Sequence, residues 1–453
     1  MLIRLASNLL GFSILVAMIV GGGTQAGLLS DTVVKLVLAF SSTFAILANR
    51  RAVLTPVSLI FPLATLLIFA LQLTPLPIAF VKSYWDPSIR EAWDAAGSLS
   101  SFGVLTTSVN STLHMLSEAA TAILFFWACL NVDSADAPRL AQFFAVGWVV
   151  HLVAGLIEFA TTNFATISTA LPYPINAGLF ANSNHFGLLM AIGIPPLIFF
   201  LVKQRSPFSG ALIALIYLLL FAVGSRSALA IALFLTLVSL IAAGGSWRRV
   251  LGFVALVSAA LAALYFSGIL FGFLFKYQDA PVARLEIAST TLQAIKNSPI
   301  FGTGFGTFLQ IYPIYESPPK ISHEYVNRAH NDFLEAVLEG GAPVALLICA
   351  YFAFLAWLGW RISRIRSMHL RDTATFAIFA LIAILLQSAV DYPLRTWALL
   401  AVFLYANASA IDAVMHVEQA RAARDLKKPA PEVSTVVPLL THLGSWDSAD
   451  RPT

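Results

Sequence analysis

Four cationic side chains in the second half of the chain are of the types that bind phosphate or move protons. An arginine guanidinium matches phosphate oxygens with paired N–H donors. An imidazole titrates near neutral pH and can therefore act as a general base. Together these side chains are able to hold a pyrophosphate group, with the histidine as a candidate general base. They are Arg226, Arg284, Arg328 and His330.

His330 follows Ala329 and precedes Asn331, and it has two further interpretations. It fits a polar residue at the start of a helix, satisfied by a neighbouring carboxylate. It also fits a metal ligand, although the possible partners lack a recognised ligand spacing, so we expect no metal. The residues of that alternative metal site are His323, Glu324, Asp332 and His330 itself.

The arginines also have simpler interpretations. Arg284 fits a surface ion pair with Glu286 or Glu335. An arginine in a tight external turn between two membrane spans fits a side chain that reaches the lipid headgroups. For Arg226 the two interpretations are equally good. For Arg395, in Asp391-Tyr392-Pro393-Leu394-Arg395, we favour the headgroup interpretation and expect its removal to be mild.

A run of glycines, Gly302-Thr303-Gly304-Phe305-Gly306, is open to interpretation as a phosphate-binding loop. No strand pattern precedes it, no Gly-Lys-Ser or Gly-Lys-Thr follows, and a crossover unit is missing. The glycines instead predict a loop that turns tightly against membrane helices.

Two short helices are expected around this glycine run, within a long polar loop at 270–341. Apolar positions Leu285, Ala288, Leu292 and Ile295 recur at helical spacing, and Asn297-Ser298-Pro299 ends that pattern. A second helix is predicted to begin near Asn331, with Asn331, Glu335 and Glu339 forming one polar stripe. Both helices look amphipathic enough to lie on the membrane surface.

The rest of the chain is apolar enough to span a membrane many times. Of its 453 residues, 58% are hydrophobic and 11% charged, and the mean hydropathy is +0.82. We predict an all-α polytopic integral membrane protein with about twelve spans. Met1–Gly27 imitates a signal peptide, but because many spans follow we interpret it as the first span. The predicted spans are 5–22, 33–49, 53–71, 112–130, 139–160, 185–202, 209–223, 228–243, 250–268, 342–360, 373–390 and 397–413.

Short basic connections set the expected orientation. Arg50-Arg51, Lys203 with Arg205, and Arg248-Arg249 all fall on the side that holds both termini, which is the cytoplasmic side by the positive-inside rule. The loop 270–341, between spans nine and ten, therefore faces the periplasm. We expect a transmembrane unit at 1–413 and a cytoplasmic, disordered tail at 414–453. The net charge of +4 reflects these loops and does not indicate nucleic-acid binding.

In this order and on this topology, the motifs resemble those of the O-antigen ligase and polymerase family of membrane glycosyltransferases. The resemblance is strongest over 209–360, and one departure from it is Pro343, which is expected to shift the start of span ten. The stretches that carry it are Ser225-Arg226-Ser227-Ala228, Arg284 with Asn297–Gly304, Ala329–Glu335 with Glu339-Gly340, and the earlier Gln72–Pro77 and Asn182–His185.

The resemblance implies transfer of a glycan from an undecaprenyl-pyrophosphate carrier at the outer face of the bacterial inner membrane, without cofactor or metal. Arg226 and Arg284 would bind the pyrophosphate leaving group, and His330 would orient or deprotonate the acceptor hydroxyl. Arg328, Asn331 and Glu339 are possible supporting residues, although a structural role at a helix end suits Glu339 equally well.

The implied partners are the lipid-linked glycan donor, a glycan or lipid A-core type acceptor, and membrane lipids. The resemblance leaves open whether the chain is a ligase or a polymerase. The principal alternative is a twelve-span transporter or flippase of lipid-linked glycans, whose ionisable groups usually lie near the middle of the membrane. Here the spans offer few polar or ionisable candidates, namely Glu118, Glu158 and Gln387, while charge is concentrated in the external loop, which favours surface chemistry. A non-catalytic scaffold for polysaccharide export is the third interpretation.

Overall fold

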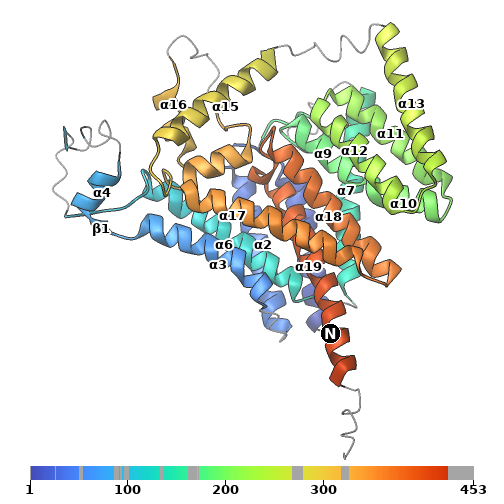
Figure 1. Ribbon diagram of the computed structural model, residues 1–453, viewed down its shortest axis with the longest axis horizontal. Helices are drawn as coiled ribbons and strands as arrows, with labels where there is room; N and C mark the ends of the chain where they lie inside the picture. The colour runs from blue at the N-terminus through green and yellow to red at the C-terminus, as the bar shows by residue number, and fades with distance from the viewer. Residues whose placement is uncertain are drawn as a thin grey trace, which may run out of the picture. The chain divides into compact units, whose positions relative to one another are not determined.

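The structure is a computed structural model, and it describes residues 2–25, 27–49, 55–85, 91, 94–95, 101–132, 136–161, 171, 173–267, 279–317 and 326–426 (Figure 1). The chain divides into two units, Met1–Val414 and Met415–Thr453. Most of the second unit lies outside the described residues, so the predicted tail is left as an expectation. The first unit contains all the residues discussed below.

The described residues of the first unit are almost wholly helical, with a single two-stranded sheet. The helices before the long polar loop are α1 Leu2–Val20, α2 Leu29–Ala48, α3 Pro56–Leu73, α4 Ile78–Tyr84, α6 Val109–Leu130, α7 Ala137–Thr161, α9 Ser183–Ile192, α10 Ile194–Lys203, α11 Pro207–Val223, α12 Arg226–Ala242 and α13 Trp247–Phe266. Those in and after the loop are α15 Asp279–Asn297, α16 Phe308–Tyr315, α17 Asp332–Ser363, α18 Met368–Ser388, the 3₁₀ turn η2 Pro393–Arg395, and α19 Trp397–Leu426. Strands β1 Leu76–Pro77 and β2 Phe102–Gly103 pair antiparallel, with Leu76 opposite Gly103.

The all-α membrane architecture predicted from the sequence is confirmed at this level. Within the described residues, nine helical segments are long and apolar enough to cross a membrane, and α11 and α12 are shorter apolar helices. Each of the twelve predicted spans falls on a helix, although the number of actual crossings stays a prediction. The sixth is divided at Gly193 into α9 and α10, because Pro195 and Pro196 follow directly and cannot donate backbone hydrogen bonds.

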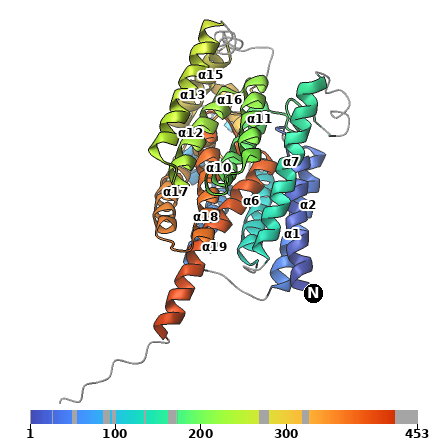
Figure 2. The ribbon, with the colours of Figure 1, turned by 90° about the vertical axis from the view of Figure 1, so that its right-hand side faces the viewer.

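The membrane helices form two groups of neighbours. α1 packs against α2 and α7, and α2 packs against α6, so the first helix is an integral part of the bundle. Figure 2 shows α1, α2 and α7 side by side. The helices α9, α10, α11 and α12 pack against one another, and α18 contacts both this group and α17.

The long polar loop folds into a compact layer through α15 and α16. α15 ends at Asn297, where the sequence predicts the stop. One face of α15 and α16 packs onto the segment before α17 and onto α17 itself, which buries an apolar cluster of Ala294, Phe308, Ile311, Tyr312, Ala329 and Leu338. This packing holds the residues around 329–332 against the membrane helices.

The glycine run makes the tight turn predicted for it. Gly302 has φ +77°, a conformation that strongly favours glycine, and a Cβ there would lie 2.3 Å from the Glu339 carbonyl oxygen. The buried Gln72 side chain fastens this turn from α3: its Nε2 donates to Phe301 O (3.0 Å) and Glu339 O (2.8 Å), and its Oε1 accepts from Phe305 N (3.2 Å).

The helix predicted near Asn331 begins at Asp332 and continues into the tenth span. Asn331 is its N-cap, because its Oδ1 accepts from Leu334 N at 3.0 Å. Gly341, with φ +65° and ψ −155°, breaks the helical path two residues before Pro343, so the segment up to Gly340 meets the span at a kink. The polar stripe of this helix does not face solvent, since Glu335 and Glu339 are fully buried. The predicted membrane-surface position of the helix stays a prediction.

Orientation across the membrane is testable by thiol labelling. We expect a cysteine at the exposed Gln310 position, in α16, to react with an impermeant maleimide in intact spheroplasts, and a cysteine at position 430 to react only after lysis. The background carries alanine at Cys129 and Cys349, because Cys349 is itself exposed. Equal labelling of both positions before lysis contradicts the predicted topology.

Candidate active site

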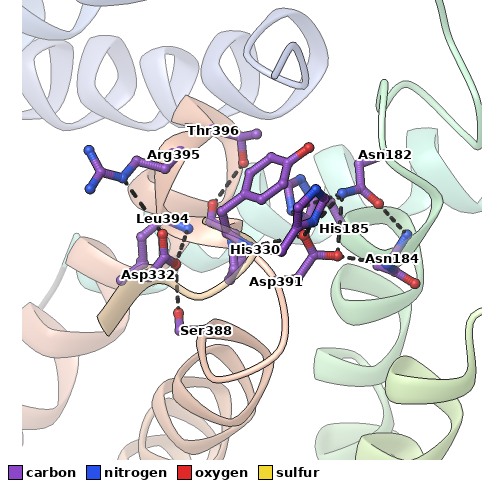
Figure 3. A network of polar contacts seen from close by, with 12 residues as sticks. Asn182, Asn184, His185, His330, Asp332, Ser388, Asp391, Leu394, Arg395 and Thr396 are labelled. Carbon is purple, nitrogen blue, oxygen red and sulfur yellow. Dashed lines mark hydrogen bonds and ion pairs between the residues drawn. The ribbon is translucent and has the colours of Figure 1, made fainter. Parts of the chain in front are cut away.

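Asp391 is the centre of a polar network at the end of α18. Its side chain is fully buried, and its carboxylate accepts hydrogen bonds from two asparagines that precede and begin α9. Asn184 Nδ2 donates to Oδ2 at 2.6 Å, and Asn182 Nδ2 lies 3.3 Å from both oxygens. The Tyr392 backbone N–H donates to Oδ1 at 3.0 Å. The loop before α9 and the turn after α18 are thereby joined (Figure 3).

Three cationic or protonatable side chains also face the Asp391 carboxylate. Arg284 Nη2 lies 3.6 Å from Oδ2, and His330 Nδ1 lies 3.6 Å from Oδ1, which is an ion-pair distance slightly beyond a hydrogen bond. His185 Nε2 is 3.9 Å from Oδ1. Burial acts to raise the pKa of Asp391, but His330, His185 and Arg284 outweigh it and hold that pKa below its ordinary value. The carboxylate is therefore ionised at neutral pH.

His330 is held in an unusual backbone conformation. Its φ is +50°, in the left-handed region that non-glycine residues adopt at a cost of about 1–2 kcal/mol. Both neighbours are fixed: Ala329 N donates to Glu335 Oε2 at 2.9 Å, and Asn331 Nδ2 donates to Ala389 O at 2.8 Å. The imidazole packs edge-on against Tyr392, with ring centroids 4.9 Å apart. Strain held by surrounding contacts is typical of functional positions.

A cavity of about 830 Å³ lies beside this network. Arg226, Arg284 and His330 line it together, as the sequence predicts, and so does Asn331. Arg226 is the first residue of α12, so the positive end of that helix faces the same space as the two guanidinium groups. Other lining residues are polar and uncharged or acidic, among them Glu158, Asn176, Ser183 and Asn184. An anion with attached hydroxyl groups suits such a lining.

Arg328 and Glu339 do not join this cavity but belong to a second, buried cluster. There Arg395 lies within ion-pair distance of three carboxylates, at 3.7 Å from Asp332 Oδ1 and 3.4 Å from both Glu335 Oε1 and Glu339 Oε2. Arg328 Nη1 donates to Glu335 Oε1 at 3.0 Å. Arg328 and Glu339 thus support the fold of the α17 segment, and they are not among the residues that line the cavity.

This second cluster overturns the headgroup interpretation of Arg395, whose side chain is only 12% exposed. Burial acts to lower the pKa of Arg395, but Glu335, Glu339 and Asp332 outweigh burial and hold that pKa above its ordinary value. The guanidinium therefore stays charged. Figure 3 shows Asp332 with Arg395 and Ser388 at the left of the view, and Asp391 with the two asparagines at the right. Arg284 lies 3.6 Å from the buried Asp391, a partner that the sequence does not predict.

Asp391 was not singled out from the sequence. The sequence places Asp391 in a short turn 61 positions after His330 and 207 after Asn184, and nothing local indicates that the three meet. The stretch Asn182–His185 was noted only as part of the family resemblance. A buried aspartate needs partners, so the one signal available was an ionisable residue in a very short connection between two spans.

The alternative metal site is not tested by the structure, since His323 and Glu324 lie outside the described residues. Among the residues that are described, histidine, cysteine and carboxylate side chains form no group of three placed to bind a metal ion.

Removal of Arg395 is expected to destabilise the protein, contrary to the mild effect predicted from the sequence. Arg395→Ala leaves three carboxylates buried around an empty position, and breaking such a network costs about 3–5 kcal/mol. Arg366→Ala, an exposed arginine between α17 and α18, is the matched control and is expected to change little. Thermal unfolding of the two purified variants gives the comparison. Equal midpoints contradict the structural role.

Comparison with known families gives one match in the region of the site. A family model described as O-antigen ligase matches residues 210–349, a range that contains Arg226, Arg284 and His330. The match confirms the family resemblance and indicates an O-antigen ligase-like function. The general class of activity that it implies is glycosyltransferase-like. Asp391 and the asparagines before it lie outside the matched range. Among curated proteins, none matches the chain.

Proposed function

From the family match and the cationic cavity, we propose that the chain transfers a glycan from an undecaprenyl-pyrophosphate carrier to an acceptor hydroxyl. The reaction takes place at the periplasmic face of the bacterial inner membrane and needs no metal. The observation that carries this proposal is the meeting of Arg226, Arg284 and His330 around one cavity, with the Asp391 carboxylate buried behind His330.

In the proposed reaction the acceptor oxygen attacks the anomeric carbon of the donor. The bond between that carbon and the phosphate oxygen breaks, and its electron pair leaves with the pyrophosphate. Arg226, Arg284 and the α12 N-terminus stabilise the negative charge that develops on the leaving group, as a metal does elsewhere. Fixed cations that are already in place lower the barrier without reorganisation.

The acceptor proton passes to His330. Because Nδ1 faces Asp391, Nε2 is the atom that takes the proton, and the ionised carboxylate stabilises the imidazolium that results. Arg284 contacts the same carboxylate, so Asp391 also orients one of the leaving-group cations. One buried aspartate thus aligns the two halves of the reaction.

The proposed binding of pyrophosphate by Arg284 is tested by a substitution that keeps the positive charge and loses the planar guanidinium group. Arg284→Lys is expected to lose most transfer activity, because an ammonium cannot reproduce the paired contacts of a guanidinium to pyrophosphate. The matched control is Lys296→Ala. Lys296 lies on the same helix, is exposed, and is not among the residues that line the cavity. The assay is release of lipid pyrophosphate by purified protein, with and without EDTA, and we expect EDTA to have no effect. Near-normal transfer by Arg284→Lys contradicts the paired contact.

The same assay separates the enzyme from the flippase alternative. Glycan-lipid translocation in liposomes without any release of lipid pyrophosphate supports a flippase. Loss of activity in EDTA supports a metal site that includes His323, Glu324 and Asp332 instead.

A further inference from the structure

One carboxylate in the cationic cavity has no part in the proposed reaction. Glu158 lies near the end of α7 that the predicted topology places outside, and it lines the same cavity as Arg226 and Arg284. Within the described part of the chain, Glu158 forms no ion pair with either arginine. Among these residues it forms one hydrogen bond, in which Oε2 accepts from Gly178 N at 3.2 Å. Its second oxygen, Oε1, is left for a ligand.

A carboxylate in this position is unfavourable for a ligand that is only an anion. Two negative charges in a half-buried cavity repel each other more strongly than they do in water. The repulsion is offset when the ligand also carries hydrogen-bond donors, because an ionised oxygen accepts stronger hydrogen bonds than a neutral oxygen does. Glu158 therefore indicates a ligand that has hydroxyl or amide N–H groups beside its phosphates.

Three other side chains of the lining have polar groups that the described protein leaves uncommitted. The Asn176 amide and the Ser183 hydroxyl form no hydrogen bond with a described residue, and Ser227 Oγ is buried without a partner there. The Asn184 amide differs, because it already donates to Asp391 at 2.6 Å. A buried polar atom without a partner costs free energy. These groups therefore favour a ligand that brings several hydrogen-bonding groups of its own.

The loop between α7 and α9 that carries Asn176 is held by its own contacts. Asn176 N donates to Phe180 O at 2.8 Å, and the buried Tyr173 hydroxyl accepts from Gly22 N at 3.1 Å. The hydrogen bond from the same loop to Oε2 orients the Glu158 carboxylate. Groups that are already in place lose little freedom when a ligand binds. The polar part of the lining is thus arranged for binding.

The cavity is large enough for a sugar ring beside a pyrophosphate group. Its volume of about 830 Å³ lies within the range of roughly 300–1,000 Å³ found for small-molecule pockets. In the proposed donor, one oxygen joins the first sugar directly to the pyrophosphate. Side chains that line one cavity together with Arg226 and Arg284 are therefore suited to contact that sugar.

We propose that Glu158, supported by Asn176 and Ser183, binds the sugar that is joined to the donor pyrophosphate, and so selects the donor by its first sugar. Glu158 Oε1 accepts a hydrogen bond from a hydroxyl or amide N–H of that sugar, while the arginines hold the phosphates. This inference rests on the proposed function in taking the bound anion to be the donor pyrophosphate. Binding does not depend on turnover, so the two are tested separately.

Equilibrium binding of lipids to the full-length protein in nanodiscs tests the sugar site. The probes are undecaprenyl diphosphate alone, and the same lipid joined to glucose, galactose, N-acetylglucosamine or N-acetylgalactosamine. We expect the wild type to bind at least one sugar-linked lipid more tightly than the sugar-free lipid, by roughly ten- to a hundredfold, as for a hydrogen bond to a charged group. If no sugar adds affinity, the proposal is overturned.

Glu158→Gln separates recognition of the sugar from support of the loop. The amide oxygen still accepts from Gly178 N, whereas the other position becomes an NH₂ donor and the charge is lost. We expect the preference for the sugar-linked lipid to disappear. Affinity for the sugar-free lipid is expected to stay or to rise, because a negative charge near the phosphates is removed. Equal weakening of both lipids assigns Glu158 a structural role and overturns the proposal.

Glu286→Gln is the matched control for the loss of charge. Glu286 lies on α15 two positions from Arg284, is exposed, and is not among the residues that line the cavity. We expect this variant to keep the preference of the wild type. If it loses the preference as Glu158→Gln does, the charge acts at a distance and contact with the sugar is rejected.

Analogues of the preferred lipid identify the contact on the sugar. In each analogue one hydroxyl or acetamido group is replaced by hydrogen. We expect one analogue to bind the wild type and Glu158→Gln equally well, because the group that contacts Glu158 is missing from it. If the wild type binds every analogue more tightly than Glu158→Gln does, no single contact exists and the proposal is overturned.

The outcomes separate this inference from the proposed function. If the wild type prefers a sugar-linked lipid but transfers no glycan, the proposed function fails while the sugar site stands. If glycan is transferred and Glu158→Gln keeps the preference, the sugar site fails alone. If neither lipid binds, the assignment of the arginines to pyrophosphate is wrong, and the sugar site fails with it.

Discussion

His330→Asn is expected to lower glycan transfer by roughly 10²–10⁴, the usual contribution of a positioned acid–base group. Donor binding is expected to change little, because the arginines proposed to bind the pyrophosphate are separate side chains. The amide of asparagine cannot accept a proton at neutral pH, so the acceptor hydroxyl stays unactivated. The measurement is turnover and donor KM in the purified-protein assay.

The choice of asparagine follows from the backbone at this position. With φ +50°, His330 occupies a region where asparagine is among the few tolerated residues, whereas alanine adds strain. A comparison of His330→Asn with His330→Ala separates loss of the imidazole from loss of the local fold. If His330→Asn turns over like the wild type, histidine has no part in the mechanism. If donor KM rises as steeply as turnover falls, the residue acts in binding.

Local signals explain which parts of the fold were predictable. The end of α15 follows from Asn297-Ser298-Pro299, because proline disfavours a helical residue before it and cannot continue the helix. The start of α17 follows from Asn331, a residue type that caps helices. Membrane helices follow from hydropathy, since their backbone bonds must be satisfied within the segment.

Burial of charge explains what the sequence misassigned. A stripe at i, i+4 and i+8 appears the same whether it faces water or a buried arginine, and here Glu335 and Glu339 face Arg395. The partner of that stripe lies 56 positions after Glu339 in another turn, so pairing is a property of the tertiary fold alone. The headgroup interpretation of Arg395 failed for the same reason.

The meeting of Arg226, Arg284 and His330 at one cavity was partly predictable, because the predicted topology puts all three on one side of the membrane. The predicted topology puts Arg226 and Arg284 on the same side of the membrane, and the glycine run predicts a loop that turns tightly against the membrane helices. The Asp391 carboxylate beside them was not predictable, since its hydrogen-bond donors Asn182 and Asn184 precede it by 209 and 207 positions in the sequence.

Asp391→Asn is expected to lower turnover by roughly 10²–10⁴, because it removes the charge that stabilises the imidazolium and holds the imidazole in one tautomer. Asn184 Nδ2 and Tyr392 N both donate to the Asp391 carboxylate, so the new amide group meets one of them with the wrong polarity. Arg284 loses its neutralising partner, and donor affinity is therefore expected to stay or to rise.

A fall in turnover without a fall in donor affinity distinguishes alignment of the reaction from general support of the fold. A collapse of the network weakens donor binding and turnover together, and it lowers the unfolding temperature as well. The matched control is Asn182→Ala, which removes the longer of the two asparagine contacts, at 3.3 Å, and keeps the charge, so turnover is expected to fall far less. Both variants are measured for turnover, donor KM and thermal unfolding. If Asn182→Ala costs as much turnover as Asp391→Asn, the negative charge is not what His330 needs, and the alignment of both halves of the reaction by Asp391 has to be abandoned.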